Sequence, residues 1–154
     1  MTIKNITSEI PVEKTLMEIE QILVKFGAKG IYKEYLGNQV KSLMFYIERE
    51  NQKIPFKLPM NLEKARKCIE KEAKEGRISK KFLQEPFRTD KAQIVGWRLI
   101  KDWIFSNLSL MEIEFADPIE IFLPYAYDMV SEKNMYQKFM ENKNNFIALE
   151  EPKK

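Results

Sequence analysis

The residues of this sequence best suited to chemistry are basic side chains that recur between positions 64 and 81. Four lysines follow each other at spacings of three and four residues, which places them within about 80° of one another on a helix. A row of ammonium groups on one helical face can contact several phosphates and displace their counterions. The pattern therefore predicts a nucleic-acid-binding surface that consists of Lys64, Lys67, Lys71, Lys74, Arg77, Lys80 and Lys81.

The acidic residues of the same stretch favour a second interpretation. Residues 61–91 carry 10 basic and 6 acidic side chains, in a chain whose formal net charge is +3. The lysines are flanked by Glu63, Glu70, Glu72 and Glu75. A helix that mixes lysine with glutamate often forms only a solvated face, which serves solubility. Both interpretations remain open at the level of sequence.

The absence of histidine from all 154 residues excludes much catalytic chemistry. It removes Ser-His and Cys-His nucleophile pairs, histidine general bases and most zinc sites. The five glycines are scattered, so the sequence has no glycine-rich phosphate-binding loop. We therefore expect a protein that is not an enzyme and that uses neither a cofactor nor a metal.

Carboxylates are the remaining candidates for a magnesium site, because Mg²⁺ prefers oxygen ligands. Glu48 and Glu50 form one candidate pair on an expected strand. The other candidates are Glu112, Glu114, Asp117 and Glu120. Neither group has the strand-borne Asp followed by Glu-x-Lys that restriction-type nucleases use, so we expect no catalysis from them.

The single cysteine, Cys68, excludes an internal disulfide and suits a reducing cytosol. We expect it to be a small packing residue on a half-apolar helix. The N-terminus lacks the apolar core of a secretory signal, and no uncharged apolar run reaches the roughly 18 residues of a membrane span. These features predict a cytoplasmic protein that does not bind membranes.

The apolar pattern predicts two helices with a three-stranded meander between them. A stripe from Val12 to Phe26 follows Pro11 and indicates the first helix. Three strands are expected at 30–36, 39–48 and 53–58, and Pro55 should place the third at a sheet edge, because proline cannot donate a ladder hydrogen bond. Asn61 is a suitable N-cap for a second helix that extends to residue 75.

A helix-length run from residue 91 to residue 114 contains both tryptophans and should form the centre of the molecule. We expect Thr89 or Asp90 to cap it and its tryptophans to be buried. Its polar side chains fall on one narrow strip, namely Arg98, Lys101, Asp102, Ser109 and Glu112. Arg98 and Asp102 are four residues apart and are expected to form an ion pair. Residues 120–128 are expected to be extended.

The expected fold is a single α+β domain of order α-β-β-β-α-α, with the antiparallel meander packed against the long central helix. Residues 1–130 should form this domain. Residues 131–154 should form a C-terminal tail, in part helical and in part loosely ordered.

The stretch GWRLIKDWIFSNLSLMEIEFADPIEIFLPY resembles small uncharacterised proteins encoded by phages, prophages and other mobile elements. The resemblance covers most of the chain up to Asp128, and it departs at Ser106-Asn107, where Ala-Gln is expected. It implies a location in the cytoplasm of a host cell and a role in DNA metabolism or in interference with host defence. The positions that carry it, which we expect to be structural, are Trp97, Arg98, Lys101, Asp102, Trp103, Phe122, Leu123, Pro124 and Tyr125.

These observations lead to one functional hypothesis and two alternatives. The first is a non-catalytic phage or mobile-element accessory protein that binds nucleic acid through a basic helix and loop. The second is a protein-interaction module, such as an inhibitor of a host defence complex, that uses exposed aromatic residues such as Tyr125 and Tyr127. The third is a sponge for a nucleotide messenger, which requires a pocket with aromatic walls and basic groups.

Overall fold

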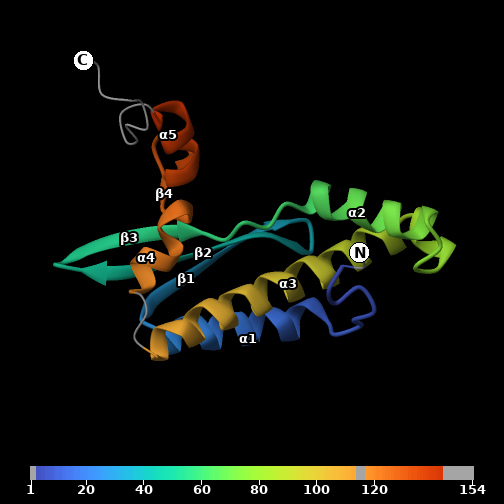
Figure 1. Cartoon of the computed structure of the whole chain (residues 1–154), viewed down its shortest axis with the longest axis horizontal. Helices are drawn as coiled ribbons and strands as arrows, with labels where there is room; N and C mark the ends of the chain where they lie inside the picture. The colour runs from blue at the N-terminus through green and yellow to red at the C-terminus, as the bar shows by residue number, and fades with distance from the viewer. Residues whose placement is uncertain (1–2, 114–116, 144–154) are drawn as a thin grey trace, which may run out of the picture.

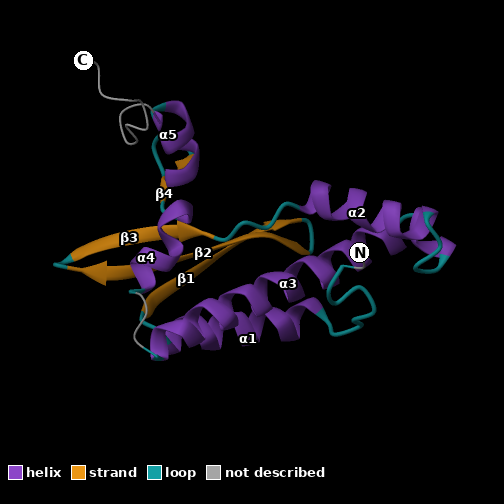
Figure 2. Cartoon of the chain, viewed as in Figure 1, coloured by secondary structure: helices purple, strands orange, loops and turns teal. Residues whose placement is uncertain are grey.

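The computed structural model describes residues 3–113 and 117–143 and confirms the predicted α+β class and α-β-β-β-α-α order (Figures 1 and 2). The elements before the long helix are α1 (Val12–Lys25), β1 (Ala28–Leu36), β2 (Gln39–Arg49), β3 (Gln52–Lys57), α2 (Leu62–Lys74) and the short helix η1 (Lys80–Leu83). The elements from the long helix onward are α3 (Phe87–Glu112), α4 (Pro118–Phe122), η2 (Leu123–Tyr125), β4 (Tyr127–Asp128), β5 (Lys133–Asn134) and α5 (Met135–Glu141).

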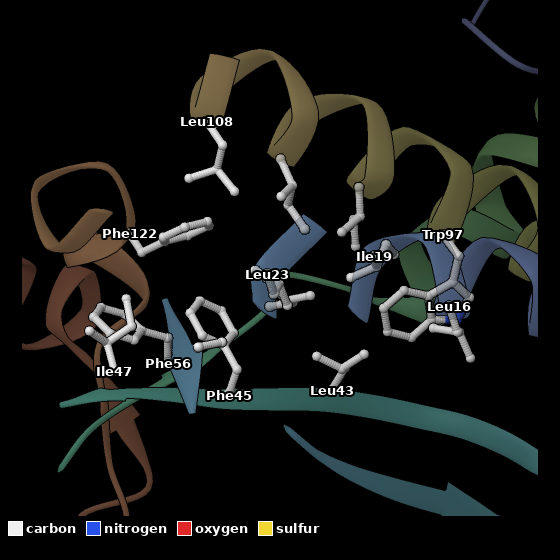
Figure 3. Close-up of a cluster of buried hydrophobic side chains, with 14 of the residues drawn as sticks. Leu16, Ile19, Leu23, Leu43, Phe45, Ile47, Phe56, Trp97, Leu108 and Phe122 are labelled. Atoms are coloured by element: carbon white, nitrogen blue, oxygen red, sulfur yellow. The ribbon is translucent and has the colours of Figure 1, made fainter. Parts of the chain in front are cut away.

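The sheet is antiparallel, with β2 between β1 and β3. The prediction that Pro55 lies on a terminal strand is therefore confirmed, and Phe56 of the same strand forms an isolated bridge with Ala126. Alternation along β2 points Leu43, Phe45 and Ile47 to one face, which α1 and α3 cover. Figure 3 shows Leu43 and Phe45 directed toward the side chains of these helices.

The long helix α3 connects two hydrophobic clusters. Its C-terminal half joins the main core between the sheet and α1, and its N-terminal half joins a second cluster with α2. The expected start near residue 91 is wrong, because α3 begins at Phe87. The Glu85 carboxylate accepts a hydrogen bond from the Thr89 backbone N–H at 3.1 Å and so stabilises the first turn from outside the helix.

The expected ion pair between Arg98 and Asp102 does not form. Arg98 donates instead to the Glu18 carboxylate at 2.6 Å, and Asp102 accepts a hydrogen bond from Asn5 at 2.8 Å. The polar strip of α3 is therefore partly covered by α1 and by the segment before it. Trp97 is fully buried as expected, whereas Trp103 is only half-buried.

Residues 120–128 were expected to be extended, but most of them are helical. The Asp117 carboxylate accepts the Ile119 N–H at 2.8 Å, and Pro118 occupies the first turn of α4, where its missing N–H is not needed. Only Tyr127 and Asp128 are strand residues, paired with β5. The expected domain boundary at residue 130 falls within the β4–β5 turn, α5 follows directly, and residues 144–154 of the expected tail lie outside the described residues.

None of the helices in the described part of the chain has both the length and the apolar character that a bilayer crossing requires.

Candidate nucleic-acid interface

Helix α2 carries four of the predicted basic residues, Lys64, Lys67, Lys71 and Lys74, on the side opposite its buried stripe. The Asn61 side chain accepts the Lys64 N–H at 3.0 Å, as expected of an N-cap. On the inner side, Ile69 and Ala73 are buried, and Ile69 belongs to the second cluster with Ile6 and residues of α3. Figure 1 shows α2 beyond the end of the sheet, alongside the N-terminal part of α3.

Three lysines of α2 form what we call the lysine row: Lys64, Lys67 and Lys71. All three are exposed, and none makes an ion pair with another described residue. Lys80 in η1 is likewise exposed and unpaired within residues 3–113 and 117–143. The sequence pattern and the structure thus place at least three ammonium groups on one solvent-facing side of α2.

The other predicted basic residues are exposed but engaged. Lys74 pairs with Glu70 at 2.7 Å, and Arg77 contacts the carboxylates of Glu72 and Glu75. The ammonium of Lys81 lies 5.1 Å from the centre of the Phe82 ring. These residues can approach a phosphate only by giving up a present partner.

The glutamates of α2 are occupied by cations outside the lysine row. Glu63 pairs with Arg66 at 2.9 Å, and Glu70 pairs with Arg88 at 3.2 Å as well as with Lys74. Hydrogen bonds from Arg77 hold the pKa of the buried Glu72 carboxyl below its ordinary value. Sequence reasoning missed this arrangement, because Arg88 lies 18 residues from Glu70.

Glu85 links α2 to the start of α3 and gives stability a pH dependence. Hydrogen bonds from Thr89 and Arg66 lower its pKa from 4.5 to about 2. Because the folded state has the lower pKa, the stabilisation is complete above pH about 4.5 and is lost as the pH falls toward 2. We expect Glu85→Gln to lower the melting temperature at pH 7 and to converge with the wild type at pH 2.

Thermal denaturation followed by far-UV circular dichroism from pH 2 to pH 7 checks this expectation. Glu48→Gln is the matched control, because Glu48 is exposed and forms no ion pair among the described residues. A melting-temperature difference for Glu85→Gln that stays constant over the whole pH range would contradict the role of this carboxylate.

Cys68 is exposed, so the expectation that it packs into the fold is wrong. It precedes the buried Ile69 by one residue, which turns its side chain about 100° away from the second cluster. Its position four residues after Lys64 places it beside the lysine row.

The residues between Trp97 and Tyr125 that were expected to be structural lie mainly in and around the main core, not beside the lysine row. Trp97 and Phe122 are buried there, and Trp103 makes edge contacts with Phe122 at 5.8 Å and with Tyr125 at 5.3 Å. Arg98 donates a hydrogen bond to Glu18 of α1, and Asp102 accepts one from Asn5 of the N-terminal segment. Nζ of Lys101 lies 5.5 Å from the centre of the Phe105 ring. Leu123 and Pro124 are exposed in η2.

The candidate metal ligands do not come together in the described part of the chain, where no group of three acidic or cysteine side chains could hold an ion. Glu50 has left the strand and adopts a positive φ of 51° in the β2–β3 turn, away from the regular alternation that would align it with Glu48. Asp117 pairs with Arg49 at 2.9 Å. Glu114 lies outside the described residues.

The nucleotide-messenger hypothesis requires a pocket with aromatic walls and basic groups. A pocket of about 490 Å³ lies between α1, the β1–β2 turn and α3. Tyr35 supplies an aromatic wall, but Glu13 and Asp90 also line the pocket. Its lysine, Lys33, pairs with Glu20. This lining disfavours a phosphate group, because the carboxylates would repel it.

Comparison with known proteins finds no matching protein-family model, no matching curated protein and no matching solved structure.

Proposed function

We propose that this protein is a non-catalytic accessory protein that binds nucleic acid through its basic surface, centred on the lysine row. The observation that carries the proposal is the contrast within α2. Its glutamates pair with Arg66, Lys74, Arg77 and Arg88, whereas no lysine of the row forms an ion pair with a described residue. The three ammonium groups can therefore contact phosphates without giving up an ion pair.

The spacing of the lysine row suits a phosphate backbone. Lys64 and Lys71 are seven residues apart, which corresponds to about 10 Å along a helix. One strand of a duplex places a phosphate at about every 3.4 Å of axial rise, so the row can cover about three phosphates. Such contacts bind the backbone and carry no base sequence.

Fluorescence anisotropy with labelled single-stranded DNA, duplex DNA and RNA at several salt concentrations tests the proposal. Three phosphate contacts predict a plot of log K against log salt with a slope near −2.7 for duplex DNA. Weaker binding at high salt with about this slope supports the proposal. An absence of binding to all three nucleic acids at 50 mM salt rejects it.

A protein-interaction module is the second candidate function, and the β4–β5 turn favours it. Met129 is 61% exposed and Val130 is 94% exposed at the tip of this turn, where a partner protein could cover them. The aromatic residues expected for this role are less available, because Tyr125 contacts Trp103 and Tyr127 lies beneath Lys57. This candidate gains weight if the anisotropy titrations show no binding.

A further inference from the structure

The face of the sheet that points away from α1 and α3 carries a groove of about 440 Å³, which we call the tyrosine groove. Side chains of all three strands and of the β4–β5 turn line it. They include Tyr32, Met44, Tyr46, Lys53, Pro55 and Met129. Strand register places Tyr32 opposite Met44, and Tyr46 opposite both Gly30 and Pro55.

Gly30 allows the Tyr46 ring to lie close against the backbone of β1. A Cβ atom at position 30 would lie 2.2 Å from the ring of Tyr46, so any larger residue would displace that ring. Because position 30 is glycine, the Tyr46 ring stays close to the sheet and leaves the tyrosine groove open next to Tyr32.

Two lysines of β3 hold their ammonium groups over tyrosine rings, Lys53 within the tyrosine groove and Lys57 beside it, opposite Met44. Nζ of Lys53 lies 5.0 Å from the centre of the Tyr46 ring, and Nζ of Lys57 lies 5.0 Å from that of Tyr127. Tyr32 is 66% exposed, which leaves it available for stacking by a flat group. Lysine side chains are flexible, so each ammonium can leave a ring for a nearby phosphate while remaining on the same strand.

We propose that the tyrosine groove takes unpaired bases of a single-stranded nucleic acid, with Tyr32 as the stacking residue and Lys53 and Lys57 as phosphate contacts. This inference rests on the proposed function and names its substrate class. Exposed aromatic rings beside cations are the arrangement that binds single strands without sequence preference. A duplex keeps its base faces stacked inside the helix, so it can use the lysine row but not this groove.

The test compares a 20-nucleotide thymidine strand with a 20-base-pair DNA duplex in anisotropy titrations. Tyr32→Ala is expected to weaken single-strand binding by roughly 5- to 100-fold and to change duplex binding less than two-fold. Tyr32→Phe keeps the ring and should bind like the wild type. Tyr35→Ala is the matched control, because Tyr35 is 61% exposed on the same strand but lines the pocket on the other face.

The outcomes separate this inference from the proposed function. If Tyr32→Ala leaves single-strand binding unchanged while charge reversal of the lysine row abolishes it, the groove proposal is overturned and the proposed function stands. If Tyr32→Ala weakens single-strand binding and charge reversal does not, the groove is supported and the lysine row is not. If neither nucleic acid binds the wild type, both are overturned. Melting curves of each variant exclude a loss caused by unfolding.

Discussion

Replacing Trp97 by alanine should remove a large part of the stability of this domain. Trp97 is fully buried in the main core, and truncation of a buried tryptophan typically costs about 3–5 kcal/mol. Domains are stable by only about 5–15 kcal/mol, so Trp97→Ala should lower the melting temperature by roughly 6–20 °C or prevent folding. Urea denaturation followed by circular dichroism measures the free energy of unfolding directly.

Two further variants make this expectation specific. Trp103→Ala should cost less, because Trp103 is half-buried against Phe122 and Tyr125. Trp97→Phe should reduce the free energy of unfolding least of the three. It removes an indole N–H that finds no acceptor among the described residues, and this partly offsets the lost packing. A loss for Trp103→Ala equal to or greater than that for Trp97→Ala would contradict the order of burial in the structure.

Local sequence patterns were sufficient to predict the elements up to α2. The stripe from Val12 to Phe26, the alternation around Phe45 and the Asn61 cap each depend on neighbours in sequence, and the helices and strands begin and end close to the expected residues. The start of α3 was predicted too late in the sequence. Its first turn is stabilised by the Glu85 carboxylate, and the spacing of apolar residues does not indicate this contact. The N-cap Asp117 and Pro118 were visible signals of α4, but the residues that follow them were predicted to be extended.

The candidate surfaces were predictable only where one element carries all of the residues. The lysine row lies on a single helix, so its periodicity identified it. Two of the cations that pair with the glutamates, Arg66 and Lys74, also lie on α2. The other two, Arg77 and Arg88, come from the loop and from α3. The tyrosine groove was missed, because its lining residues come from three strands and a turn that is more than 70 residues further along the chain. Strand alternation around Tyr32 and Tyr46 was the one signal that could have indicated it.

Charge reversal of the lysine row should abolish most nucleic-acid binding. Changing Lys64, Lys67 and Lys71 to glutamate removes about three phosphate contacts and adds three repulsive charges, so we expect at least a roughly 100-fold loss of affinity at low salt. The salt dependence of any residual binding should also become shallower, by about one unit of slope for each lost contact. Anisotropy titrations at two salt concentrations measure both quantities.

A control of equal charge separates the lysine row from net charge alone. Lys14, Lys29 and Lys41 are exposed and form no ion pairs within the described ranges, and their change to glutamate likewise takes the formal net charge from +3 to −3. This control should lose far less affinity, because its residues do not form one face. Equal losses in the two variants would show that binding follows net charge and not the lysine row. Changing Lys64, Lys67 and Lys71 to alanine controls for unfolding, because alanine avoids the repulsion that new glutamates would add to α2. This variant should still weaken binding about tenfold or more.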